Sequence, residues 1–200
     1  MRVLELSASA GAAYAGLLLG ELGFAVDRVD LESVQSQLDD ERDARKLFLH
    51  RKKRTISAES VELSDYDAVI EDCGAGKLAE LNLDYPSIRK SHPDLPIVSV
   101  SPFGLTGPCS DWAANDINAQ AAGGVLHVSG FDGEPPRKLP GDVALMIAGL
   151  HAATAAICAV FAIREGTESG LHIDISAQDT MMQHWTRHVA DYAYSGTPLG

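Results

Sequence analysis

Asp142 is the residue of this sequence whose type and position best suit covalent chemistry. It follows Pro140-Gly141 and directly precedes Val143–Arg164, a proline-free stretch of mostly Ala, Leu, Ile and Met that predicts a long apolar helix. A carboxylate at the start of a helix meets exposed N–H groups and the positive end of the helix dipole, which keep it ionised. Such a carboxylate can act as a nucleophile. Aspartate is also a common N-cap without any chemical role, and the position alone favours that interpretation.

Histidine and cysteine offer two further kinds of site, and neither is favoured. His184 and His188 are four residues apart on a predicted helix, a spacing that can chelate a metal, but the glutamate of a zincin motif is missing between them. Cys73, Cys109 and Cys158 are far apart and none has a CxxC partner, so we expect no metal site. Their odd number indicates reduced thiols in a cytoplasmic protein.

Length and charge limit the classes of protein that fit. A chain of 200 residues is suited to one domain, 1–200, with one core. With 28 acidic and 16 basic side chains the formal net charge is -12, which opposes general binding to nucleic acid. Glu5 interrupts the first apolar run, so we expect no signal peptide in this segment. Leu145–Ile163 contains His151 and indicates a buried core helix rather than a membrane span.

Strand and helix patterns alternate along the chain. Strands are predicted at Val3–Leu6, Ala25–Val29, Thr55–Ser57, Tyr66–Glu71, Ile97–Ser101 and His172–Ser176. Helices are predicted at Ala12–Leu22, within Leu31–Leu49, after Gly74–Gly76, and at Ser87–Ser91, Asp116–Gly123, Val143–Arg164 and Gln178–Tyr194. This order predicts an α/β fold with a mostly parallel, Rossmann-like sheet flanked by helices. The first turn lacks GxGxxG, which leaves only a backbone-lined anion site at the start of the helix that follows.

Several short motifs follow one another in a specific order. They are Val3–Ser7, Tyr14 to Gly23, Arg28–Asp30, Lys53–Ile56, Ala68–Glu71, His92-Pro93, Gly104, Gly107-Pro108, Asp116, Gln120-Ala121, Gly141-Asp142, Ala148–Leu150 and Arg164–Gly170. With these motifs the sequence resembles the class III CoA-transferases from Val3 to about Tyr194. The resemblance implies a half-length version of that fold, because members of the family are about twice as long.

The resemblance also implies an activity, acyl-CoA:carboxylate CoA transfer. In the transferases of that family, the aspartate matching Asp142 is the nucleophile and carries CoA as an aspartyl thioester. CoA is then a substrate, and we expect no permanently bound cofactor. The resemblance places contacts with CoA at Ser9, Ala10, Gly11, Asp72 and Cys73. Arg28, Lys53, Arg54 and Lys77 either hold the phosphates of CoA or are solvated surface charges, and both interpretations stay open.

Departures from the family pattern keep other functions open. Glu80 stands where the family usually has an arginine, and the second half of the family is absent, so a non-catalytic or regulatory subunit that pairs with another chain is the alternative. Asn115 replaces the histidine of the racemase branch, which disfavours racemisation of 2-methylacyl-CoA. We expect acyl-CoA and a small carboxylic acid as partners. We also expect a homodimer, or a heteromer with a chain supplying the missing half, without nucleic acid or membrane.

Overall fold

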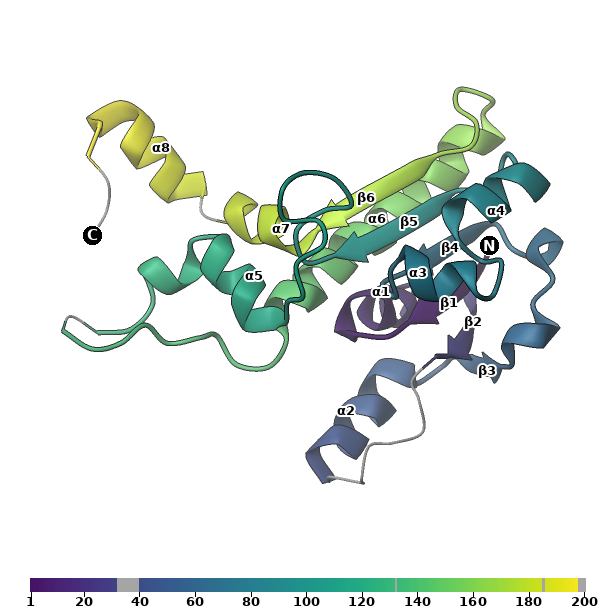
Figure 1. Ribbon diagram of the computed structural model, residues 1–200, viewed down its shortest axis with the longest axis horizontal. Coiled ribbons are helices and arrows are strands. Elements are labelled where there is room, and N and C mark those ends of the chain that lie inside the picture. The colour runs from purple at the N-terminus through teal and green to yellow at the C-terminus, as the bar shows by residue number, and fades with distance from the viewer. Residues whose placement is uncertain (32–39, 132, 185, 198–200) are drawn as a thin grey trace.

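The computed structural model describes residues 1–31, 40–131, 133–184 and 186–197. Its centre is a six-stranded sheet with the strand order β3-β2-β1-β4-β5-β6, and all neighbouring strands run parallel (Figure 1). The strands are β1 (Arg2–Ser7), β2 (Ala25–Asp30), β3 (Arg54–Ile56), β4 (Ala68–Glu71), β5 (Ile97–Ser101) and β6 (His172–Ser176). This is the strand order of a Rossmann-type sheet, so the predicted α/β class is confirmed.

Helices cover both faces of the sheet, as a parallel sheet requires. On one face lie α1 (Ala10–Glu21) and α6 (Val143–Arg164), which pack on strand residues such as Val3 and Val98. On the other lie α3 (Ala75–Ala79) and α4 (Tyr85–Ser91), which pack on strand residues such as Leu4 and Leu6 (Figure 1). Successive side chains of β1 therefore enter two separate apolar layers, which fixes the register of the strand.

Helices α1 and α6 approach each other closely where both are built from small residues. A Cβ atom at Gly149 would lie 2.4 Å from the carbonyl oxygen of Gly11, so only glycine allows this contact. By length and composition α6 is also the one helix among the described residues that is able to cross a membrane. Its alanine-rich inner face is nevertheless buried in this fold, while Leu150 and Phe161 on its outer side are 48% and 65% exposed.

The remaining helices lie around this core. They are α2 (Asp40–His50), α5 (Asp116–Ala122), α7 (Ala177–Gln183) and α8 (Thr186–Ser195), with short 3-10 turns at Ala58–Ser60, Leu63–Asp65 and Val125–His127. Helix α2 confirms the helix predicted within Leu31–Leu49, of which residues 32–39 lie outside the described part. In Figure 1, α2 and α8 extend from the body on different sides.

The single helix predicted at Gln178–Tyr194 is wrong, because α7 and α8 are separate helices. Helix α7 ends at Gln183, and the backbone N–H of His184 binds the carbonyl of Met181. The imidazole of His184 bonds to the carbonyl oxygen of Thr180 at 2.8 Å. This side chain thus occupies a carbonyl of the last turn, which explains why the helix stops although the sequence contains neither glycine nor proline at this point.

Candidate active site

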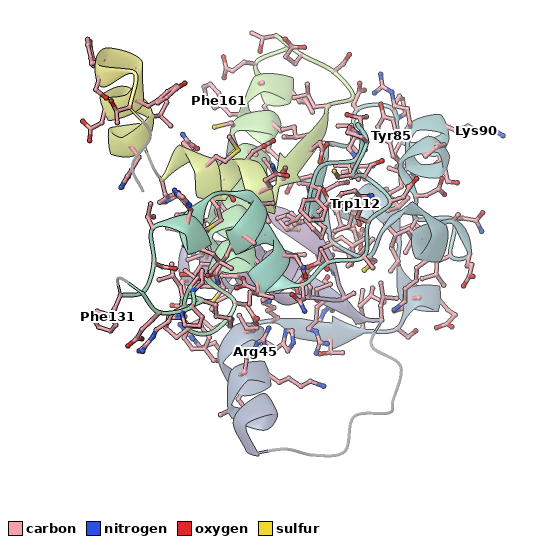
Figure 2. The ribbon with its side chains drawn as sticks, turned by 60° about the vertical axis from the view of Figure 1, so that its left-hand side comes forward. Arg45, Tyr85, Lys90, Trp112, Phe131 and Phe161 are labelled. Carbon is pink, nitrogen blue, oxygen red and sulfur yellow. The ribbon has the colours of Figure 1, made fainter. Side chains whose placement is uncertain are left out.

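Asp142 stands at the N-cap position of α6, but its side chain makes no capping hydrogen bond. Its carboxylate instead forms an ion pair with Arg45 of α2. The side chain of Asp142 is 20% exposed and that of Arg45 is 51% exposed. Figure 2 labels Arg45 on α2. The carboxylate therefore makes no hydrogen bond to its own helix, and one ion pair with a half-exposed cation covers it.

The carboxylate that caps α6 belongs to Asp116, at the start of α5. Asp116 is 4% exposed, and its Oδ1 accepts a hydrogen bond of 3.1 Å from the backbone N–H of Leu145 in the first turn of α6. Its other oxygen accepts a bond from the amide of Gln120 and lies 3.6 Å from the ammonium of Lys138. Asp142 thus occupies the N-cap position that the sequence indicated, but its side chain does not cap the helix. Asp116 caps the first turn instead, so the carboxylate of Asp142 is not used for capping.

Gln120 and Lys138 hold the loop that leads into Asp142. The amide of Gln120 is fully buried, accepts from the backbone N–H of Leu139 at 2.8 Å and donates to the carbonyl of the same residue at 3.3 Å. Lys138 donates to the carbonyl of Gly141, whose φ of 66° lies in the left-handed region. The loop therefore enters α6 in a defined path, and sequence reasoning missed this function of Gln120. The spacing of Asp116 and Gln120, one helical turn apart, was the available signal.

A second group of predicted residues gathers where the strand order reverses, between the carboxyl ends of β1 and β4. Sheets of this kind bind ligands at such a switch point. Ser9, Ala10 and Gly11 form the start of α1 there, and Asp72 and Cys73 follow β4. Hydrogen bonds from Ser9 to Asp72 show that the structure brings these two segments together.

Asp72 occupies the donors at the start of α1. Its Oδ1 accepts from the backbone N–H of Ala8 at 2.6 Å and of Ser9 at 3.2 Å. Its Oδ2 accepts from the hydroxyl of Ser9 at 2.6 Å and from the backbone N–H of Ala12 at 2.9 Å. The sequence predicted that the N–H groups at this helix start could bind an anionic ligand. In the structure they already donate hydrogen bonds to Asp72.

Cys73 is poorly suited to nucleophilic chemistry. Its thiol donates to the carbonyl of Leu6 at 3.0 Å, and burial raises the pKa of this thiol to about 12. Glu71, at the end of β4, is 5% exposed and accepts from the backbone N–H groups of Cys73 at 2.9 Å and Gly74 at 3.3 Å. Burial raises the pKa of the Glu71 carboxyl as well.

Lys53 and Arg54 are bound within the protein. The side chain of Lys53 is fully buried, and its ammonium lies 2.6 Å from a carboxylate oxygen of Glu5, which is also fully buried. Desolvation lowers the pKa of Lys53. Arg54 donates to both carboxylate oxygens of Asp27, at 2.7 and 2.8 Å. This hydrogen bonding lowers the pKa of the Asp27 carboxyl.

The other predicted cations lie at different places. Arg28 is half-buried on β2, and Lys77 is exposed on α3, where it donates to the backbone carbonyl of Leu31. Glu80 is exposed directly after α3. The structure thus places the predicted phosphate contacts on several separate elements, and their part in binding CoA stays a prediction. Within the described part of the chain, no three His, Cys, Asp or Glu side chains form a group able to hold a metal ion.

Comparison with known proteins identifies the family. The model of CoA-transferase family III matches residues 63–200, which include Asp142 and the whole of α6. The chain belongs to CoA-transferase family III. The resemblance inferred from the sequence motifs is therefore confirmed.

Relatives in this family are longer than this chain. It is 29% identical over 213 residues to the succinyl-CoA:glutarate CoA-transferase of Mus musculus, covering 96% of this chain and 48% of the relative. It is 33% identical over 133 residues to the succinate–glutarate CoA-transferase of Agrobacterium fabrum, covering 66% and 33%. A CaiB/BaiF family protein from Brucella suis superposes with a TM-score of 0.85 at 27% identity, covering 100% of this chain and 58% of that structure. The chain spans about half the length of the curated relatives it matches.

Proposed function

We propose that the protein transfers CoA from an acyl-CoA to a carboxylic acid, with Asp142 as the nucleophile. Membership of CoA-transferase family III supports the transferase class. The main support for Asp142 as the nucleophile is that its side chain does not cap α6, because Asp116 binds the first turn in its place. Relatives named for transfer between succinyl-CoA and glutarate agree with carboxylic acids as the substrate class.

The reaction proceeds through covalent intermediates on the carboxylate. An oxygen of Asp142 attacks the thioester carbonyl carbon of acyl-CoA, the C–S bond breaks, and a mixed anhydride and the CoA thiolate result. The thiolate attacks the carbonyl carbon of Asp142, which gives an aspartyl-CoA thioester and releases the first acid as its carboxylate. The acceptor carboxylate then attacks this thioester and expels the thiolate. Finally the thiolate attacks the acceptor carbonyl, which yields the new acyl-CoA and returns Asp142 to its ionised form.

The N-terminal end of α6 suits the charges that develop in these steps. Each attack places negative charge on a carbonyl oxygen, and backbone N–H groups with the positive end of a helix dipole stabilise such an oxyanion. Asp142 directly precedes the first turn of α6, so its carbonyl carbon reacts within reach of these groups. The left-handed backbone at Gly141 and the bonds of Gln120 keep the loop in place during the reaction.

We also propose that the active form is an assembly. This assembly is a homodimer, or a heteromer with a chain that supplies the part of the relatives that this chain does not cover. Leu150, Phe161 and Tyr194 are 48%, 65% and 94% exposed, and a partner would cover such side chains. The other partners in this proposal are acyl-CoA and a small carboxylic acid, in the cytoplasm. The acidic net charge of -12 opposes nucleic acid as a partner.

A non-catalytic subunit is the second candidate function, and two observations favour it. The start of α1 is already filled by Asp72, and Lys53 and Arg54 are bound to carboxylates of the protein. A chain that kept the fold without binding CoA would have these features. Racemisation is not supported, because the side chain of Asn115 is an amide, which is neither a general acid nor a general base near neutral pH. The backbone N–H of Asn115 donates to the side chain of Asn118 at 3.0 Å.

Chemical trapping separates the two candidates. The protein is incubated with succinyl-CoA and then with hydroxylamine, and the modified peptide is located by mass spectrometry. An aspartyl hydroxamate at Asp142 in the wild type, absent in Asp142→Asn and retained in the matched exposed-site variant Asp94→Asn, supports the transferase. Absence of the hydroxamate together with absence of CoA binding in calorimetry supports the non-catalytic subunit.

A further inference from the structure

The ion pair between Arg45 and Asp142 joins a peripheral helix to the candidate nucleophile. Arg45 lies one turn before Leu49 on α2, so both side chains project from the same face of that helix. Leu49 is 5% exposed and packs with Ala10 and Ala13 of α1. Anchored in this way, α2 brings the guanidinium of Arg45 into an ion pair with the carboxylate of Asp142.

This contact has to change during the reaction proposed for Asp142. An oxygen that is held by a guanidinium is a weaker nucleophile, so the pair must open before the oxygen reaches a thioester. Once Asp142 is acylated, its negative charge is gone and Arg45 has lost its anion. The half-exposed guanidinium then favours another carboxylate in place of the first.

We infer that Arg45 binds a second carboxylate on the acyl group, exchanging Asp142 for that carboxylate as the substrate enters. The inference rests on the proposed role of Asp142, and it names the substrate class as acyl-CoA thioesters of dicarboxylic acids. Arg45 is in this account a specificity-determining residue, and its ion pair with Asp142 keeps the nucleophile covered until a substrate with a free carboxylate displaces it.

Two other cations, Lys138 and Lys53, have partners that the reaction does not consume. Lys138 lies 3.6 Å from Asp116, whose carboxylate caps α6 and takes no part in the proposed reaction. Lys53 is fully buried in its pair with Glu5. The anion bound to Arg45 is the nucleophile itself, so the reaction that uses this carboxylate also frees the cation. Arg45 therefore loses its anion, and can bind another one, at the step at which an acyl group is present.

The chemistry of the guanidinium agrees with a carboxylate as its ligand. Arginine presents a planar fork of N–H donors that matches the two oxygens of a carboxylate. Arg45 is 51% exposed, so a ligand can reach it from solvent, and a half-exposed ion pair exchanges its anion more easily than a buried one. A monocarboxylic acyl group of the same length would open the pair without offering a replacement, and it should react more slowly.

The first half-reaction tests this inference without any acceptor acid. Wild-type protein in its native assembly is mixed with succinyl-CoA or with butyryl-CoA, which has the same chain length and no second carboxylate. The rate of CoA attachment to Asp142 is followed by intact mass. The same measurement is made on Arg45→Met, on Arg45→Lys, and on Arg51→Met, which removes a nearby arginine paired with Glu21.

We expect the wild type and Arg51→Met to prefer succinyl-CoA by about tenfold or more in the second-order rate constant of CoA attachment, as one charge-assisted hydrogen bond provides. Arg45→Met should lose this preference, with butyryl-CoA reacting at an unchanged or higher rate, and Arg45→Lys should keep part of it. Equal loss on both thioesters, or an unchanged preference, would overturn the role of Arg45 while leaving Asp142 as the nucleophile. Failure of both thioesters to label the wild type would instead overturn the proposed function, and the role of Arg45 with it.

Discussion

Replacing Asp116 should cost far more stability than replacing Asp142, although Asp142 stands at the start of the helix. In Asp116→Ala the first turn of α6 loses its cap, worth about 0.5–2 kcal/mol, and the buried amide of Gln120 loses an acceptor, worth about 1–3 kcal/mol. Gln120 keeps its bonds with Leu139, so we expect a total of about 2–4 kcal/mol. In Asp142→Ala only a half-exposed ion pair with Arg45 disappears, worth about 0–1 kcal/mol.

Urea denaturation of the two variants and the wild type measures this difference. The midpoint and slope of each transition give the free energy of unfolding, and equal slopes show that the variants lose the same structure on unfolding. Asp142→Ala is the matched control for Asp116→Ala, because both remove one carboxylate at the same end of α6. If Asp142→Ala were as destabilising as Asp116→Ala, Asp142 would be a structural cap, and the claim that its carboxylate is free to react would be contradicted.

Three further predictions test the surroundings of the site. Gly149→Ala should destabilise the protein by about 1–3 kcal/mol in urea denaturation, since its Cβ would meet backbone, whereas Gly20→Ala has room and should gain up to about 1 kcal/mol; equal effects would contradict the close helix contact. Because the pKa of Asp27 is lowered in the folded protein, its ionised carboxylate stabilises the fold above the unfolded pKa of about 3.9, and this stabilisation is lost as the pH falls through the folded pKa. The free energy of unfolding measured across pH 2–5 should therefore depend less on pH in Asp27→Asn than in the wild type. Iodoacetamide should modify the exposed Cys158 well before Cys73, and peptide mass spectrometry showing Cys73 modified first would contradict its burial and raised pKa.

Local signals in the sequence were sufficient for most of the fold. The predicted bounds of the strands at Ile97–Ser101 and His172–Ser176 and of the helix at Val143–Arg164 match the structure, because apolar patterning and flanking turn residues mark them clearly. Helix α1 begins at Ala10 rather than Ala12, with Ser9 as its N-cap. The end of α7 escaped detection because a side-chain bond of His184, rather than a glycine or proline, terminates it.

The candidate site was predictable only in part, and the reason is the same for each omission. The motif Gly141-Asp142 and the helix behind it were visible in the sequence. The cap from Asp116, the ion pair from Arg45 and the bonds of Asp72 to the start of α1 were not visible. Each joins residues that are far apart in the chain, so no periodicity or spacing records them. These contacts decide which carboxylates are occupied and which one remains available for chemistry.

Transfer of an isotope from the acceptor acid to Asp142 tests the central claim most directly. The protein is supplied with acyl-CoA and an acceptor acid labelled with oxygen-18 in its carboxylate, and the peptide containing Asp142 is analysed after turnover. If Asp142 is the nucleophile, the anhydride steps leave one acceptor oxygen on its carboxylate, so the peptide gains the label only when acyl-CoA is present. Turnover that leaves this peptide unlabelled would show that CoA passes between the acids without bonding to Asp142.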